Sequence, residues 1–206
     1  MQFAFTEEQE LLRREARHLF SRDGAWGRDE LADLRFLDRA IVFEEAGRAN
    51  RGDEFFDAAA PERERLAVLA LEAAGIAAKV LELAVEHAKT RQQFGRPIGA
   101  YQAVAHPLAD TYVETELARS LAYWAAWCVA EEEKEAEIAV VAAKSYAADV
   151  AVAACERSIQ VHGGVGFTWE HVLHRYYKRA LAIQAYGGYA RAHRTKIAAW
   201  LLHGGS

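Results

Sequence analysis

The chain has 206 residues, a formal net charge of -5 at pH 7 and a hydrophobic content of 52%. This length allows a sizeable core, and the many alanines with only 3 prolines favour helix over sheet. An acidic balance excludes nucleic acid as the main expected partner, because neutralising phosphates requires a basic face. We therefore expect an all-α protein that binds no nucleic acid.

The cysteines and the N-terminal sequence indicate a compartment. Cys128 and Cys155 lie far apart and lack C-x-x-C spacing, so both are predicted to be small core residues and not a disulfide. Residues 1–14 carry acidic side chains and no apolar run of signal-peptide length. No segment is expected to reach the length of a membrane span. The sequence thus predicts a cytoplasmic protein without membrane insertion.

Residues 1–60 are predicted to form an N-terminal helical segment. Thr6 and Gln9 have the spacing of a capping box, and the apolar stripe after them predicts a helix over about residues 7–21. A second helix is expected from Asp29 to Arg48.

Residues 50–60 are rich in Gly, Asp and Ala and indicate a linker, although the Phe55-Phe56 pair could dock on the core.

Residues 61–206 are expected to form a second domain that contains three long helices. The first covers about residues 62–91, where seam positions alternate between spacings of three and four. These positions are Leu66, Leu69, Ala73, Ile76, Val80, Leu83 and His87. The second helix runs from about Tyr101 to Ala130, and the third repeats the spacing from Ile138 to Ile159, after an acidic turn. Short loops make long helices antiparallel neighbours, which predicts an up-and-down bundle.

Residues 160–170, Gln-Val-His-Gly-Gly-Val-Gly-Phe-Thr-Trp-Glu, interrupt the helical pattern with three glycines in four positions. Such glycines permit a sharp turn and let a flat or anionic ligand reach main-chain N–H groups. A tight turn with a C-cap glycine explains the same pattern. Thr168 is expected to cap a helix ending near Ala182, and a last helix follows Gly187-Gly188. No G-x-G-x-x-G dinucleotide motif, metal cluster, nucleophile triad or phosphate loop is found.

A second motif lies at residues 91–102, which read Arg-Gln-Gln-Phe-Gly-Arg-Pro-Ile-Gly-Ala-Tyr-Gln. Together with residues 160–170, it resembles the two signature segments of the acyl-CoA dehydrogenase family. The resemblance covers residues 62–203, the family's C-terminal helical domain, and residues 6–48 resemble pieces of its N-terminal helical domain. Further matching positions are Ala109-Asp110, Glu116-x-x-Arg119, Arg175 and Arg179.

The resemblance implies an FAD site shared between subunits. It places Arg91 and Gln102 against the flavin nucleotide of a neighbouring subunit. The arginine fork suits a pyrophosphate, and Phe94 offers an apolar platform beside it. The alternatives are that Arg91 only caps a helix and that Phe94 belongs to the core.

The glycine turn is implied to lie against the adenosine part of FAD. The matching residues are Gln160, Val161, His162, Gly163 and Gly164. The alternative for His162 is a turn histidine whose hydrogen bonds are satisfied locally.

Two departures from the family pattern affect the expected chemistry. About ten residues, 52–61, replace further helices and the central β-domain that walls the flavin ring. The family's catalytic glutamate lies in an I-Y-E-G-T-like segment, but residues 183–188 read Ile-Gln-Ala-Tyr-Gly-Gly and hold no carboxylate. Ala185, Tyr186 or Gly187 takes its place, depending on the alignment.

Two other carboxylates are candidates for the base, because some family members place it on the first long helix. Glu64 lies one residue from the expected position, where Arg65 stands, and Glu72 lies two turns further along. A solvated first-turn glutamate is the favoured interpretation of Glu64, because carboxylates are stabilised near helix N-termini, and apolar neighbours suggest partial burial of Glu72.

Three functional interpretations remain open. The chain is a subunit of a hetero-oligomeric acyl-CoA dehydrogenase, a non-catalytic helical assembly protein, or an enzyme that acts alone through Glu64 or Glu72. In the first, a full-length paralogue supplies the β-domain and the base, and this chain by itself does not dehydrogenate acyl-CoA. Apolar seams and the Trp124 and Trp127 pair also predict a dimer or tetramer.

Overall fold

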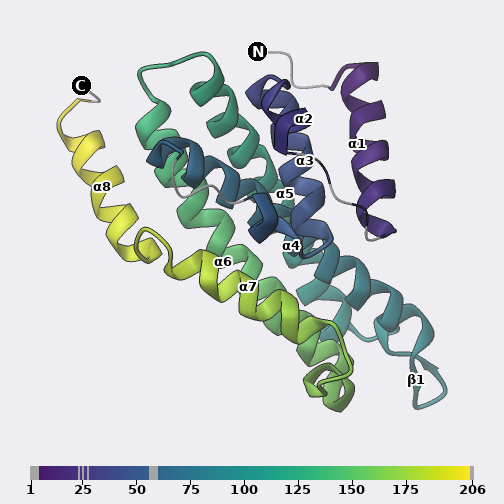
Figure 1. Ribbon diagram of the computed structural model, residues 1–206. Helices are drawn as coiled ribbons and strands as arrows, with labels where there is room; N and C mark the ends of the chain where they lie inside the picture. Colours follow the sequence, from purple (N-terminus) through teal and green to yellow (C-terminus); the bar gives the residue numbers. More distant parts are fainter. Residues whose placement is uncertain (1–4, 23, 25, 27, 56–59, 205–206) are drawn as a thin grey trace.

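The computed structural model describes residues 5–22, 24, 26, 28–55 and 60–204. The elements up to the first long helix are α1 (Glu7–Ser21), α2 (Arg28–Ala32), α3 (Phe36–Arg48), η1 (Gly52–Phe55) and α4 (Glu62–Thr90). A short hairpin follows, with β1 (Gln92–Gln93), β2 (Arg96–Pro97) and η2 (Ile98–Ala100). The remaining elements are α5 (Gln102–Ala130), α6 (Ala136–His162), η3 (Gly163–Phe167), α7 (Leu173–Ala185) and α8 (Ala190–Leu202). The predicted all-α bundle is confirmed (Figure 1).

Helix α6 lies at the centre of the bundle and packs against α4, α5, α7 and α8. Its buried residues point in all directions around the helix, whereas the sequence predicted one apolar seam. The described helical stretch Ala136–Phe167 contains an 18-residue window that is apolar enough to span a membrane, with a mean hydropathy of 1.6, and 72% of that window is buried. The expectation that no segment reaches such a length was therefore wrong. The stretch is apolar because α6 is surrounded by other helices and buries most of its surface against them.

Two glycines allow α3 and α4 to cross at close range. A Cβ added to Gly75 on α4 would lie 2.0 Å from the main-chain oxygen of Glu44. A Cβ added to Gly47 on α3 would lie 2.2 Å from the main-chain oxygen of Glu72. The two backbones are thus in direct contact, which brings both glutamates into the interior.

Buried carboxylates of α3 attach the other helices to the bundle. Glu44 accepts hydrogen bonds from Arg119 Nε at 2.8 Å and from the Tyr123 hydroxyl at 2.6 Å, both on α5. Glu45 accepts two from Arg17 of α1, at 2.8 and 2.7 Å. At the start of α1, the predicted capping box between Thr6 and Gln9 is present.

The structure corrects two predicted helices. The helix expected from Asp29 to Arg48 is divided into α2 and α3, because Arg35 has extended backbone and begins α3 as its N-cap. The residue before it, Leu34, packs on the small apolar cluster that contains Phe20.

Thr168 was expected to cap a helix, but its hydroxyl donates back to the Val165 carbonyl at 3.0 Å and it ends η3. Helix α7 begins five residues later, at Leu173, whose main-chain N–H donates to His171 Nδ1 at 3.3 Å, and it ends at Ala185.

Several smaller predictions have outcomes as well. Cys128 and Cys155 are buried free thiols, as expected. The acidic run after α5 forms the turn between α5 and α6. Trp124 and Trp127 are half-buried against the main core. The docking of the Phe55-Phe56 pair concerns side chains outside the described part of the chain, and the boundary near residue 60 stays a prediction.

Candidate functional site

Both signature segments lie at the same end of the bundle. Helices α4 and α6 run in parallel, so the hairpin after α4 and the glycine turn after α6 emerge together, at the lower end in Figure 1. Contact between the two ends is direct, because the rings of His87 on α4 and His162 on α6 are stacked with centroids 4.4 Å apart. The start of α1 and the end of α8, in contrast, lie towards the opposite end of the molecule (Figure 1).

Arg91 and Phe94 are positioned by the hairpin. The main chain of Arg91 caps α4, with its N–H donating to the His87 carbonyl and its carbonyl accepting from Ile98 N–H, both at 2.8 Å. No hydrogen bond or ion pair of its guanidinium is found within the described residues. Phe94 has a φ of 52° at the hairpin tip and is 92% exposed. The alternative that Phe94 is a core residue is thereby excluded for this chain.

Helix α5 fixes the hairpin from the other side. The Tyr101 hydroxyl donates to the Gln93 carbonyl at 3.2 Å, and the Arg96 guanidinium lies over the Tyr101 ring at 4.0 Å. Gln102 is the first residue of α5 and is exposed. The hairpin therefore presents Arg91, Phe94 and Gln102 outward from a fixed base.

The three glycines of the turn differ in their surroundings. A Cβ added to Gly163, whose φ is 63°, or to Gly164 would meet no atom within 4 Å. One added to Gly166 would lie 2.8 Å from the Ile159 carbonyl oxygen. The first two glycines thus border open space, and the third is required for packing. Beside them Gln160 is exposed, whereas Val161 packs on the apolar cluster under the hairpin.

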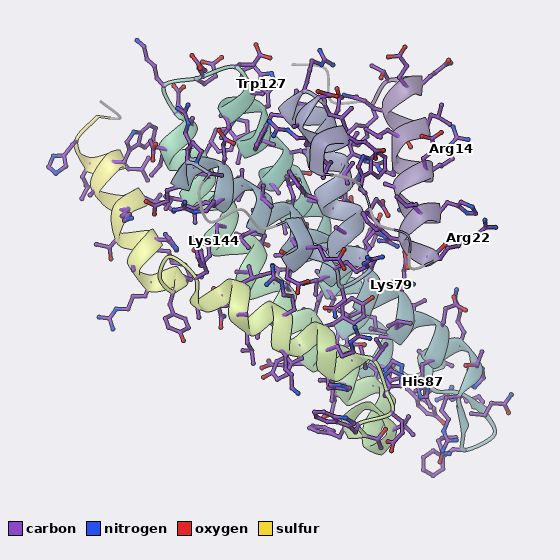
Figure 2. All side chains as sticks on the ribbon, in the orientation of Figure 1. Arg14, Arg22, Lys79, His87, Trp127 and Lys144 are labelled. Atoms are coloured by element: carbon purple, nitrogen blue, oxygen red, sulfur yellow. The ribbon has the colours of Figure 1, made fainter. Side chains whose placement is uncertain are left out.

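His162 is the middle member of an imidazole column. Its Nδ1 lies 2.8 Å from the Ser158 carbonyl oxygen, as expected for a locally satisfied turn histidine. Its ring also stacks on His87, and its centroid lies 4.6 Å from that of His171. Figure 2 shows His87 at this end of α4. Sequence reasoning missed the column, because only folding brings residues 87, 162 and 171 together.

The two outer members of the column, His87 and His171, are weaker bases than a free imidazole. Burial, then His162 and Arg91, lower the pKa of His87 below its usual value. Burial, followed by His162 and His174, lowers the pKa of His171. Both imidazoles are thus neutral at pH 7.

The residues at this end fit the nucleotide part of FAD. They combine a guanidinium that has no partner among the described residues, an exposed aromatic ring, two exposed amide side chains and a glycine turn with space in front of it. A pyrophosphate suits the guanidinium, and a flat base can approach the turn because no Cβ is present.

The candidate base Glu72 has a structural partner. It is 1% exposed, not partly buried as expected, and accepts hydrogen bonds from Arg179 Nε at 2.5 Å and Nη2 at 2.7 Å. Burial raises the pKa of Glu72 above its usual value, although Arg179 opposes the effect. With both oxygens engaged, the carboxylate is unsuited to taking a proton from a substrate. Glu64 is half-buried in the first turn of α4.

Lys144 binds the segment of residues 183–188, where the family resemblance predicts a catalytic glutamate. It is buried on α6, and its Nζ donates to the Gln184 carbonyl at 3.0 Å and the Gly188 carbonyl at 2.8 Å. Burial lowers the pKa of Lys144 to about 8. Gly187 and Gly188 have φ values of 65° and 105°, so the turn between α7 and α8 has a conformation that side chains disfavour.

Comparison with known proteins identifies the family. Residues 58–202 match the family model described as "Acyl-CoA dehydrogenase, C-terminal domain". The acyl-CoA dehydrogenase IpdE2 of Mycobacterium tuberculosis is 46% identical over 113 residues, which are 55% of this chain and 34% of that protein. The caffeyl-CoA reductase-Etf complex subunit CarC of Acetobacterium woodii is 33% identical over 134 residues, 65% of this chain and 35% of its own length.

A solved structure gives the same result. The butyryl-CoA dehydrogenase of Megasphaera elsdenii superposes with a TM-score of 0.65 at 29% identity, over 78% of this chain and 38% of the other. The chain thus spans about a third of the length of several of its relatives. Its match to the family model nevertheless includes both signature segments and helices α4 to α8, and the chain belongs to the acyl-CoA dehydrogenase family.

Proposed function

We propose that this chain is a subunit of an acyl-CoA dehydrogenase-like flavoprotein complex, in which it holds the nucleotide end of FAD. The observation that carries the proposal is the pairing of the unengaged Arg91 and the exposed Phe94 with the open glycine turn at one end of the bundle. An arginine without a carboxylate partner among the described residues is available to a pyrophosphate, and the exposed ring and the open turn offer apolar surface and space to the rest of the nucleotide.

Each residue has a defined part in this proposal. The Arg91 fork binds the pyrophosphate, Phe94 supplies an apolar surface beside it, and the Gln102 amide donates to the nucleotide. Gln160, Gly163 and Gly164 face the adenosine part, where the missing Cβ atoms leave room for a flat base, and the Gly163 N–H itself already donates to main-chain carbonyls at the end of α6. The bound FAD would supply the hydride acceptor for α,β-dehydrogenation of an acyl-CoA thioester.

A partner is proposed because the chain lacks two requirements of the reaction. The segment of residues 183–188 carries no carboxylate, and Glu72 is engaged by Arg179. The flavin ring and the thioester also need walls that exclude water. A full-length paralogue in the cytoplasm would bring the β-domain and the base, and CarC is an example of a relative named as the subunit of a complex.

A non-catalytic assembly protein is the second candidate. It is favoured by an exposed apolar row on α5, formed by Tyr112, Val113 and Leu117. A homodimer that covers this row would not need flavin. Tight self-association of the chain without any flavin, together with failure to retain flavin beside a paralogue, would favour this candidate.

The decisive experiment co-expresses the chain with a full-length acyl-CoA dehydrogenase paralogue. Flavin absorbance of the purified complex and acyl-CoA oxidation with an artificial electron acceptor are measured. We expect both with the complex, and neither after Arg91→Ala. The control is Arg96→Ala, which removes a guanidinium from the same hairpin but one that stacks on Tyr101.

The lone chain reconstituted with FAD tests the remaining interpretation. We expect no turnover, because a missing general base alone costs about a hundred- to ten-thousand-fold in rate. Robust turnover by the lone chain that disappears in Glu64→Gln or Glu72→Gln would contradict the proposal and show an enzyme that acts alone.

A further inference from the structure

The imidazole column connects three segments that surround the proposed nucleotide site. His87 belongs to α4, His162 ends α6, and His171 lies between η3 and α7. The ring centroids are 4.4 Å apart for the first pair and 4.6 Å for the second. The column therefore closes the glycine turn against the end of α4, four residues before Arg91.

The electrostatic surroundings of the column are positive. Arg91 and the other imidazoles act on His87, and His174 acts on His171. His174 itself stacks on Trp169 at 4.5 Å, and Lys178 lies over the same Trp169 ring at 4.2 Å.

The carboxylates near these segments are engaged elsewhere or lie in solvent. Glu86 pairs with Lys89 on α4 at 2.8 Å, and Glu156 of α6 accepts from the Tyr177 hydroxyl at 3.1 Å. Glu170, next to His171 in the chain, is exposed. Among the charged groups that shift the pKa of His87 or His171, none is an acid. An added positive charge on His87 or His171 therefore has no carboxylate to offset it among these groups of the described chain.

We propose that the column is part of the nucleotide site and that binding of a pyrophosphate-bearing ligand at Arg91 is coupled to proton uptake by His87 and His171. This inference rests on the proposed function, because it assigns the pyrophosphate to Arg91. It adds residues and a regulatory property that the two signature segments do not contain.

The physical reason is the sign of the charge that the ligand brings. Without a ligand, burial and then the neighbouring rings and Arg91 disfavour an imidazolium at His87. A pyrophosphate on Arg91 offsets the repulsion by Arg91 and attracts the imidazolium, so the ligand-bound state takes up a proton at a higher pH than the free state does. By linkage, the ligand then binds more tightly at low pH.

The test uses ADP-ribose as the probe, because its pyrophosphate is a diester that does not titrate between about pH 5 and pH 8, the range in which histidine does. Calorimetric titrations of the full chain in two buffers of different ionisation enthalpy give affinity and protons taken up. We expect binding about two- to tenfold tighter at about pH 5.5 than at about pH 7.5, as one added charge near a solvated phosphate allows. His87→Gln should remove most of this difference, and the exposed His106→Gln should retain it.

A second readout follows the imidazoles directly. Histidine ring signals in NMR should show the pKa of His87 rising when ADP-ribose binds, and less so in Arg91→Met. The inference is overturned if the chain binds no ADP-ribose in this pH range. It is equally overturned if the pH dependence survives the double variant His87→Gln, His171→Gln.

The two proposals fail in different ways. Flavin retention in the complex that requires Arg91 but is independent of pH would contradict the inference and leave the proposed function standing. Proton-coupled binding of ADP-ribose by a chain that never retains flavin beside a paralogue would support the inference and contradict the proposed function.

Discussion

The two ends of α4 use arginine in opposite ways. Towards its N-terminal half, Glu72 is buried and holds Arg179 with two hydrogen bonds, while on the neighbouring α3 Glu44 holds Arg119. At its C-terminal end, Arg91 has a guanidinium without an ion pair in the described structure and lies near an exposed Phe94. The comparison shows that a buried arginine–glutamate pair maintains the fold, whereas an arginine left without a carboxylate is available to a ligand.

The largest expected effect comes from breaking the buried pair. Glu72→Ala removes a fully buried side chain and leaves the partly buried Arg179 without its carboxylate, which together should cost about 3–5 kcal/mol of unfolding free energy. Urea denaturation followed by circular dichroism measures it. The double variant Glu72→Leu, Arg179→Leu should recover a large part of the loss. A single variant as stable as the parent chain would show that the pair is dispensable.

Gly75 and Gly164 extend the comparison between the packed interior and the open ligand end. Gly75→Ala places a Cβ 2.0 Å from the Glu44 main-chain oxygen and should destabilise the chain by about 1–3 kcal/mol, because two helix backbones must separate. Gly164→Ala is the matched control, since its Cβ would meet no atom within 4 Å. Thermal unfolding should leave that variant unchanged while flavin retention in the complex decreases. Equal loss of stability in both variants would contradict the assignment of open space at the turn.

The pH dependence of the unfolding free energy tests whether the histidines of the column resist protonation. The pKa values of His87 and His171 are lowered in the folded chain, so their contribution to stability is present above about pH 6.5 and is lost as the pH falls through their folded pKa values. Urea midpoints measured between about pH 5 and pH 7.5 should decrease on the acidic side. The decrease should be smaller in His87→Gln and unchanged in His106→Gln. A flat profile in the parent chain would mean that the column does not resist protonation.

The smallest expected effect on stability is at the proposed ligand end. Arg91→Ala should change the unfolding free energy by no more than about 0.5 kcal/mol, because its guanidinium makes no ion pair in the described structure. Arg179→Ala, which frees a buried carboxylate, should be far more damaging in the same urea assay. Comparable losses in the two variants would remove the distinction between structural and ligand-binding arginines.

The sequence by itself determined the features that depend on neighbours along the chain. The long helices follow from seams such as Leu66 to Leu83, since a repeat of three and four places apolar side chains on one helical face. The capping box of Thr6 and Gln9 and the break at Gly163 are also local, and the two signature segments identified the family.

Tertiary structure alone decided how residues distant in the sequence combine. Nothing in the spacing of residues 87, 162 and 171 shows that their rings stack, because that depends on how α4 and α6 are aligned along their axes. Glu72 could be seen as a carboxylate among apolar residues, but its partner Arg179 lies 107 positions away. The central position of α6 was hidden for the same reason, since local periodicity reports one buried face and the number of surrounding helices decides how many faces are buried.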